Sequence, residues 1–354
     1  MKAHVLHGIG DLRYEEVGMP VPKPGEVLVE VKAAGICGSD IPRIYETGTW
    51  SFPLIPGHEF SGIVREAGEK AEGSLIGKRV GIFPLLPCGK CGPCREERYE
   101  MCRSYSYLGS RTDGGFAQYA AVPVWNLVEL PEGVSYEAAA MLEPMAVAVH
   151  AMRSIAPAKK EKVAVCGLGT IGLLLVMFLK EAGIDDLLVI GNKEFQRKNV
   201  SDLGIEKERY FDSRDGDITE YIMEYTGGLG VNVFFECIGK NEIVSEAIRA
   251  TAPGGRIQLV GNPASDMNFD RNTYWKILRN QLTVKGNWNS SFAHSEKDDW
   301  HYVLERLKEG RVNPERCITQ KFGLEELEKG LHIMRDKTRE YVKVMALSQD
   351  GRMC

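Results

Sequence analysis

The feature that most constrains the fold is a glycine-rich hexapeptide, Gly167-Leu168-Gly169-Thr170-Ile171-Gly172. It lies between an apolar strand pattern over 162–166 and an apolar helix pattern over 171–182. In this context Gly167 permits a tight turn, Gly169 lets the backbone approach a pyrophosphate, and Gly172 lets the helix pack close to the strand. The start of the helix adds N–H groups and a positive dipole end. The hexapeptide with its flanking patterns therefore predicts a dinucleotide-binding unit.

Further apolar strand patterns at 187–190, 232–237 and 256–260 alternate with helical patterns, which favours a doubly wound parallel sheet. The first half instead shows short β-type runs separated by Pro-Gly turns. With 354 residues the chain is long enough for two domains. We predict an α/β protein in which a Rossmann domain covers 148–290. A mostly β domain is expected to consist of two segments, 1–147 and 291–354. The second segment contains a charged helix and a closing strand.

The strand that follows the hexapeptide ends in a run that bears on cofactor choice, Gly191-Asn192-Lys193-Glu194. An enzyme that uses NAD usually carries Asp near this point, where it holds the ribose 2′-hydroxyl. Glycine at 191 removes the repulsion of a 2′-phosphate, and Lys193 and Arg197 can pair with one. The run favours NADP. Two alternatives stay open: Glu194 swings back to hold NAD, or the two cations are only solvated helix charges.

Four of the nine cysteines crowd into one loop with the spacing Cys88-x2-Cys91-x2-Cys94-x7-Cys102. Four thiolates can close a tetrahedral zinc shell and leave no open position, which is typical of a structural site. Free or disulfide-bonded cysteines are the alternative. The chain is large, shows no secretory segment and has an odd number of cysteines, so metal binding is favoured.

A second set of metal donors is dispersed: Cys37, His58, Glu59 and Glu143. Each residue by itself is weak evidence for a metal site, since a lone buried cysteine, for example, is usually part of a core. Together they supply a thiolate, an imidazole and carboxylates, which suits a catalytic zinc with one open position. Asp40 is placed to orient the His58 ring, and Ser39 to contact a substrate oxygen.

These motifs together resemble the zinc-dependent medium-chain alcohol and polyol dehydrogenases. The signature Gly57-His58-Glu59-x2-Gly62-x5-Gly68-x2-Ala71, the cysteine quartet, Glu143-Pro144 and the glycine loop follow in that family's order. The resemblance covers essentially the whole chain and implies a GroES-like catalytic domain beside the Rossmann domain. Runs such as 37–43, 84–88, 108–116 and 276–288 are similar to those of galactitol-1-phosphate 5-dehydrogenases. Gly191 departs from the family's usual Asp.

The resemblance implies hydride transfer between a secondary alcohol and NAD(P), with two zinc ions per chain. Cys37, His58 and Glu143 would hold the catalytic zinc, with Glu59 an additional or exchanging ligand, and Ser39 would relay the hydroxyl proton. For a polyol phosphate such as galactitol 1-phosphate, which would give tagatose 6-phosphate, we expect Arg43 and Arg111 to bind the phosphate. Surface charge or an internal ion pair is the alternative for both arginines. A free polyol such as sorbitol, or threonine, is the alternative substrate.

Composition sets broader limits. A net charge of −5 gives no reason to expect a nucleic-acid or membrane partner, and no signal peptide or apolar run of about 20 residues is visible. We therefore expect a cytoplasmic enzyme, and the family resemblance implies a homodimer or homotetramer. A non-catalytic NADP-binding redox sensor is the distant alternative. The intact set of Cys37, Ser39, His58, Glu59 and Glu143 argues against it.

Overall fold

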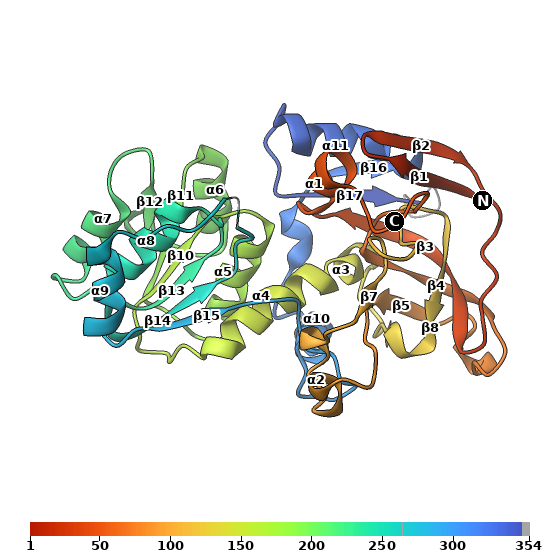
Figure 1. The fold of residues 1–354 in the computed structure, drawn as a ribbon, viewed down its shortest axis with the longest axis horizontal. Coiled ribbons are helices and arrows are strands. Elements are labelled where there is room, and N and C mark those ends of the chain that lie inside the picture. Colours follow the sequence, from red (N-terminus) through yellow and green to blue (C-terminus); the bar gives the residue numbers. More distant parts are fainter. Residues whose placement is uncertain (264, 349–354) are drawn as a thin grey trace. The chain divides into compact units, whose positions relative to one another are not determined.

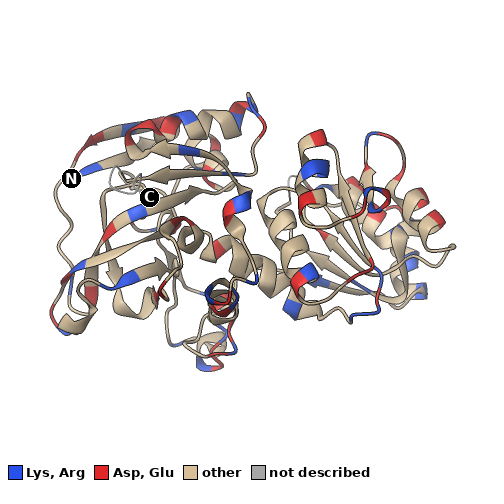
Figure 2. Ribbon diagram, turned by 180° about the vertical axis from the view of Figure 1, so that it is seen from behind, with Lys and Arg blue, Asp and Glu red and all other residues tan. Residues whose placement is uncertain are grey.

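The computed structural model describes residues 1–263 and 265–348. The chain divides into two compact units, Met1–Pro144 with Ser291–Cys354, and Met145–Ser290. The sequence predicts the boundaries at 147/148 and 290/291. Each unit is described by itself below and can be followed by its labels in Figure 1. Acidic and basic residues are interspersed along the ribbon of both (Figure 2).

The first unit is built on a seven-stranded sheet in the order β16-β17-β3-β4-β5-β9, with β8 also paired to β3. The strands are β3 (Glu26–Ile36), β4 (Glu59–Ala67), β5 (Arg79–Ile82), β8 (Tyr119–Pro123), β9 (Leu127–Glu129), β16 (Ile318–Gly323) and β17 (Lys343–Leu347). The hairpin of β1 (Lys2–Gly8) and β2 (Asp11–Glu16) and the short pair β6 (Leu85–Leu86) and β7 (Ser106–Tyr107) are separate sheets. The closing strand β17 therefore lies beside β3, far from it in sequence.

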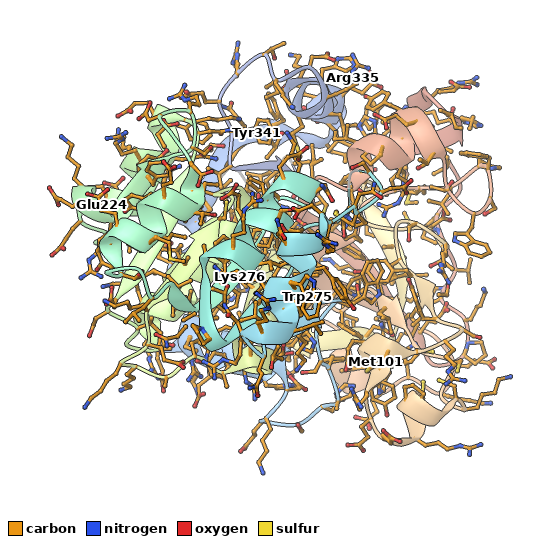
Figure 3. All side chains as sticks on the ribbon, turned by 60° about the vertical axis from the view of Figure 1, so that its left-hand side comes forward. Met101, Glu224, Trp275, Lys276, Arg335 and Tyr341 are labelled. Carbon is orange, nitrogen blue, oxygen red and sulfur yellow. The ribbon has the colours of Figure 1, made fainter. Side chains whose placement is uncertain are left out.

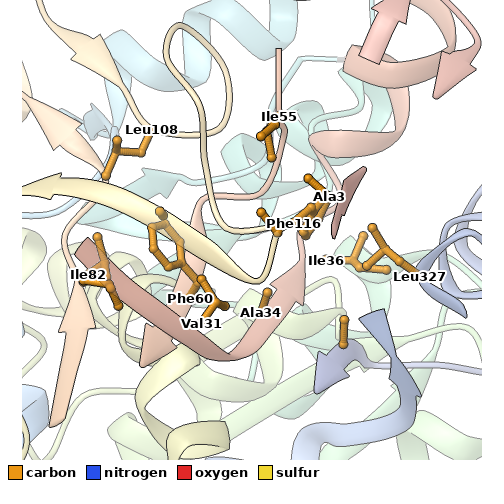
Figure 4. Packing of buried hydrophobic residues seen from close by; sticks show 14 of the residues in the cluster. Ala3, Val31, Ala34, Ile36, Ile55, Phe60, Ile82, Leu108, Phe116 and Leu327 are labelled. Atoms are coloured by element: carbon orange, nitrogen blue, oxygen red, sulfur yellow. The ribbon is translucent and has the colours of Figure 1, made fainter. Parts of the chain in front are cut away.

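Helices of this unit are short, except for two in its last segment. They are α1 (Asp40–Pro42), α2 (Gly92–Arg95), α3 (Tyr136–Ala140), α10 (Asp299–Lys308) and α11 (Leu327–Asp336). Apolar residues of β3, β4 and β5 form the core together with side chains from the loops and α11, as Figure 4 shows for Val31, Phe60, Ile82, Phe116 and Leu327. This core fixes the ends of β3 and β4, where the candidate metal donors lie.

The second unit contains a six-stranded, all-parallel sheet in the order β12-β11-β10-β13-β14-β15. This is the strand order of a Rossmann fold. The strands are β10 (Val163–Cys166), β11 (Leu187–Gly191), β12 (Tyr210–Asp212), β13 (Val231–Glu236), β14 (Thr251–Leu259) and β15 (Thr283–Gly286). The helices are α4 (Leu142–Ile155, which begins in the first unit), α5 (Thr170–Glu181), α6 (Glu194–Asp202), α7 (Ile218–Tyr225), α8 (Asn241–Ala250) and α9 (Arg271–Arg279).

Both faces of this parallel sheet are apolar, because helices cover both. Ala164, Ile190 and Phe234 pack with side chains of α7 and α8 on one face. Their neighbours Val165 and Val189 are equally buried, as expected for residues that point to the opposite face. The predicted doubly wound fold beside a mostly β domain is confirmed. Among the described residues, no helix combines the length and apolar character needed to cross a bilayer.

Candidate active site

A mixed cluster of Cys37, His58 and Glu59 forms where β3 ends and β4 begins. The two strands are antiparallel, with Gly35 opposite Glu59, so the residue after β3 and the residue before β4 become neighbours. One donor atom from each of the three side chains lies within 4.8 Å of the others. His58 and Glu59 are buried, and Cys37 is half-buried. A thiol, an imidazole and a carboxylate at this spacing suit zinc.

The fully buried Asp40 organises this cluster. Its Oδ2 accepts a hydrogen bond of 2.9 Å from the Cys37 amide, and its Oδ1 lies 3.3 Å from His58 Nδ1. Arg43 donates to Oδ1 at 2.7 Å. Burial opposes ionisation, but the nearby His58 and Arg43 lower the pKa of Asp40. The carboxylate orients the imidazole, as a metal-bound histidine requires, and the Ser39 hydroxyl lies 3.3 Å from Cys37 Sγ.

Glu143 lies near the start of α4 and outside the 4.8 Å group. Its Oε1 accepts a 3.2 Å hydrogen bond from the Tyr107 hydroxyl, whose ring meets the His58 ring edge-on at 5.7 Å. Burial, together with the charge of Glu59, raises the pKa of Glu143 to about 7. Glu143 is therefore near enough to the cluster to feel the charge of Glu59. Its role as a metal ligand stays a prediction. Tyr107 was not predicted, and a single Tyr in the two-residue strand β7 gives no pattern that would identify it.

Lys343 is a second residue that the sequence analysis missed. It is buried in β17, and its ammonium group forms an ion pair with Glu59 Oε2. A signal for it was present, since Lys343 is the one charge in the apolar run Val342-Lys343-Val344-Met345-Ala346-Leu347. A lysine inside a buried strand needs an anionic partner.

The four-cysteine cluster (Cys88, Cys91, Cys94 and Cys102) is formed by one loop around α2. Its sulfur atoms lie within 4.8 Å of one another, with 3.4 Å between Cys91 and Cys94. Backbone N–H groups, of Arg103 first, lower the pKa of the Cys91 thiol to about 6. Burial raises the pKa of the Cys94 thiol to about 12. Four sulfurs this close, two of them on buried cysteines (Cys94 and Cys102), fit a bound zinc, which would make all of them thiolates.

The glycine loop has the conformation that the motif predicts. Gly167 has φ of +101°, and a Cβ on Gly172 would lie 1.8 Å from the Gly167 carbonyl oxygen. A Cβ on Gly169, by contrast, would meet nothing within 4 Å, so the backbone can be approached there. Thr170 and Ile171 open α5, and their N–H groups belong to its first turn. This loop can bind a pyrophosphate.

Gly191 ends β11 in a confined place. A Cβ there would lie 2.7 Å from Gln196 Oε1 and 2.9 Å from the Tyr210 hydroxyl. Gln196 Oε1 in turn accepts a hydrogen bond from the Asn192 amide. A side chain at 191 therefore requires that both Gln196 and Tyr210 shift, which spacing alone did not indicate.

Three cations lie on the segments around Gly191. Arg197 stacks on Tyr210 at 4.7 Å and lies 3.5 Å from the exposed carboxylate of Glu194. Lys193 lies 5.5 Å from the Phe195 ring. Arg214, which the sequence analysis did not select, makes a bidentate contact with Asp212 and is 63% exposed. Because Asp212 pairs with Gly191 in the sheet, Arg214 comes close to this end of β11.

The two predicted phosphate-binding arginines differ in their surroundings. Arg43 is committed to Asp40, and its side chain is 20% exposed. Arg111 is packed against two aromatic rings, with 4.1 Å to Tyr105 and 4.6 Å to Trp50. The Tyr105 ring meets Tyr107 at 6.2 Å, and Tyr107 meets His58. A chain of aromatic contacts thus connects Arg111 to the mixed cluster.

Comparison with known protein families gives two matches. Residues 23–132 match the alcohol dehydrogenase GroES-like domain, and residues 170–309 match the zinc-binding dehydrogenase family. The chain is 32% identical to L-threonine 3-dehydrogenase of Pyrococcus abyssi (90% of this chain, 91% of the relative). It is 32% identical to sorbitol dehydrogenase of Halalkalibacterium halodurans (98% of each). Identity to galactitol 1-phosphate 5-dehydrogenase of Escherichia coli K12 is 30% (92% and 94%).

Solved structures show the same similarity over nearly the whole length. The crystal structure of galactitol-1-phosphate dehydrogenase from Escherichia coli superimposes with a TM-score of 0.91 at 29% identity, covering 98% of this chain and 100% of that one. A zinc-binding dehydrogenase from Sinorhizobium meliloti bound to NADP gives a TM-score of 0.89 at 28% identity, covering 98% of each chain.

Proposed function

Because this chain belongs to the family of zinc-dependent medium-chain alcohol and polyol dehydrogenases, we propose that it oxidises a secondary alcohol of a polyol phosphate with NADP. Galactitol 1-phosphate is the best candidate. The observation that carries the substrate class is Arg111, a cation joined to the mixed cluster through Tyr105 and Tyr107. A phosphate held by Arg111 would place the polyol along these rings.

In this proposal Cys37, His58 and one carboxylate, of Glu143 or Glu59, hold the catalytic zinc. The four-cysteine cluster holds a second, structural zinc. Bound zinc would supply Lewis acidity that makes the substrate hydroxyl easier to ionise. Asp40 fixes the imidazole, and Ser39, beside Cys37, accepts the hydroxyl proton and passes it on towards solvent. NADP bound at the glycine loop supplies the hydride acceptor.

Preference for NADP is supported by the missing carboxylate at Gly191 and by the cations around it. Lys193, Arg197 and Arg214 all lie on segments that meet at this end of the sheet. Each of these cations already has an aromatic or acidic neighbour. A bound 2′-phosphate would therefore interact with them alongside these existing contacts. The NADP in the Sinorhizobium structure is consistent with this choice for a relative.

Steady-state kinetics test the proposal directly. Galactitol 1-phosphate, galactitol, sorbitol and threonine would each be offered with NAD and with NADP, and reduction followed by absorbance. We expect the highest kcat/KM for the phosphorylated polyol with NADP. Turnover of free polyols alone would remove the phosphate role of Arg111 and Arg43, and would favour the second candidate, a sorbitol-type dehydrogenase, which the similarity to sorbitol dehydrogenase supports.

Arg111→Ala separates phosphate binding from catalysis. It should raise KM for the polyol phosphate about 10-fold or more, because a charge-assisted contact of roughly 1.5–3 kcal/mol is lost, and leave free polyols unaffected. Arg335→Ala is the matched control, since Arg335 also stacks on a tyrosine, 4.5 Å from the Tyr45 ring. Arg43→Ala is less informative, because it also removes the partner of Asp40.

We also propose that the enzyme is a homodimer formed through the edge strand β15. Every residue of β15 is exposed, and in the described sheet it pairs only with β14. Val284 on this strand and Trp275 on α9 (Figure 3) expose 41% and 44% of their surface. An open edge strand with an exposed apolar side chain such as Val284 can pair with a second copy across a two-fold axis. Light scattering should give a dimer, and Val284→Lys a monomer; a wild-type monomer would contradict this.

A further inference from the structure

Lys343 occupies an unusual position for a lysine. Its side chain is 2% exposed, that of its partner Glu59 is 1% exposed, and the two are joined by an ion pair inside the sheet. A buried charge is strongly unfavourable unless it is paired. Cys37 and Glu143 are also near enough to act on Lys343 electrostatically. The ammonium group therefore lies close to three of the candidate metal donors, Glu59, Cys37 and Glu143.

The backbone leaves space for this pair at one residue. Gly35 on β3 lies opposite Glu59 on β4 and opposite Met345 on β17, so it separates the two strands that carry the charges. A Cβ on Gly35 would lie 2.4 Å from Glu59 Oε2 and 2.7 Å from Lys343 Cε. Any other residue would push into the contact between ammonium and carboxylate. The glycine thus lets Lys343 reach across β3 to Glu59.

We propose that Lys343, with the space left by Gly35, is a positioning residue that weakens Glu59 as a metal ligand and so keeps one ligand position exchangeable. The ammonium group takes up lone-pair density of Oε2 and competes with a metal ion for the carboxylate. His58 has a charged neighbour of the opposite sign, the anion Asp40, which strengthens the imidazole as a ligand. The inference rests on the proposed zinc-dependent function.

The test uses the full-length enzyme loaded with Co²⁺ in place of zinc and reads the metal without substrate. Lys343→Met should free Glu59 to bind the metal, so release of that metal to a chelator should slow about 10-fold, the scale of outer-partner effects. The visible Co²⁺ absorption should weaken as coordination number rises, and kcat should fall. Lys343→Arg should restore all three readouts, and Lys343→Gln, which keeps a donor without the charge, should be intermediate.

Two further measurements make the outcome decisive. Release from the four-cysteine cluster should not change in any variant. Adding Glu59→Gln to Lys343→Met should return metal release to the wild-type rate or faster. Unchanged or faster release in Lys343→Met, or in Lys343→Gln if the Met variant does not fold, would overturn the proposal. Shifted metal readouts in an enzyme inactive on every polyol phosphate would reject the substrate assignment alone.

Discussion

The two metal-donor clusters differ in how the chain builds them. The four-cysteine cluster comes from one loop, with four identical donors and no acidic or basic side chain in hydrogen-bond contact with the sulfurs among the described contacts. The mixed cluster comes from the ends of two strands and has different donors, with charged partners on His58 and Glu59. In the first cluster the four cysteines alone can complete a metal shell, whereas in the second the donor strength of His58 and Glu59 depends on charged residues around them.

This difference separates two roles. Four thiolates satisfy zinc completely and leave no position for substrate, so their effect is on stability. On the proposed function, three or four mixed donors next to Asp40, Lys343 and Tyr107 would leave one metal position open for ligand exchange and catalysis. We therefore expect substitutions in the mixed cluster to change activity more than stability, and substitutions in the four-cysteine cluster to do the reverse.

The largest effect is expected for Cys37→Ala. Loss of a thiolate ligand should remove the Lewis acid, which contributes several kcal/mol, and lower kcat/KM about 1,000-fold or more. The melting temperature should change little. Enzyme assays and calorimetry on the same preparation check this, with Cys317→Ala, a buried cysteine outside both clusters, as the control. Full activity of Cys37→Ala would remove Cys37 from the site.

Cys94→Ser should produce the opposite pattern. Breaking the closed shell should destabilise the protein by about 3 kcal/mol or more, because loss of a metal is among the few causes of large destabilisation, and zinc content should fall by about one equivalent per chain. The folded fraction should keep its kcat. Calorimetry, metal analysis and active-site titration measure the three quantities. An inactive but fully stable variant would reverse the roles of the two clusters.

Gly191→Asp extends the comparison to the cofactor site, which needs no metal. A carboxylate here should repel a 2′-phosphate and lower kcat/KM for NADP about 10-fold, or 1.4 kcal/mol, relative to Gly191→Ala. The Ala variant is the matched control, because its Cβ meets Gln196 and Tyr210 equally. An equal decrease in kcat/KM for NADP in both variants would show that the added Cβ, and not the carboxylate charge, causes the effect.

Tyr107→Phe should give the smallest effect. It removes the hydroxyl that donates to Glu143 but keeps the ring beside His58. Because the pKa of Glu143 is raised to about 7, this carboxyl is partly neutral at neutral pH, and a hydrogen bond of about 1 kcal/mol, the value for neutral partners, predicts a roughly fivefold decrease in kcat/KM. Tyr99→Phe, next to the four-cysteine cluster, should leave kinetics unchanged. A decrease of equal size in both variants would mean that hydroxyl loss at either cluster has a general structural cost.

Features that depend on neighbouring residues were predictable from sequence. The cysteine spacing, the glycine hexapeptide and the apolar strands of the Rossmann sheet each carry their signal within a short segment. The start of β14 was missed, because Pro253-Gly254-Gly255 is typical of a turn, yet the strand begins at Thr251. The edge strand β15 was missed as well, since all its residues are exposed and no apolar run marks it.

Features that depend on strand register were not predictable. Pairing of Lys343 with Glu59 requires that β17 lie beside β3 and that Gly35 separate the two charges. The ion pair of Arg43 with Asp40 likewise requires the tight geometry of α1; the sequence analysis offered Arg43 as a phosphate ligand and gave an internal ion pair only as an unspecified alternative. In both cases the residue types were visible, but their partners were set by tertiary structure.

The position of β17 also has a consequence for synthesis. Glu59 and Lys343 are 284 residues apart, and the whole Rossmann unit lies between them in the chain. A ribosome will therefore have delivered every proposed zinc ligand, and the complete glycine loop, well before the lysine emerges. If zinc is acquired during translation, it meets a Glu59 that has no cationic partner and binds more firmly. On the proposed roles, an exchangeable ligand position would then arise only when β17 is inserted beside β3.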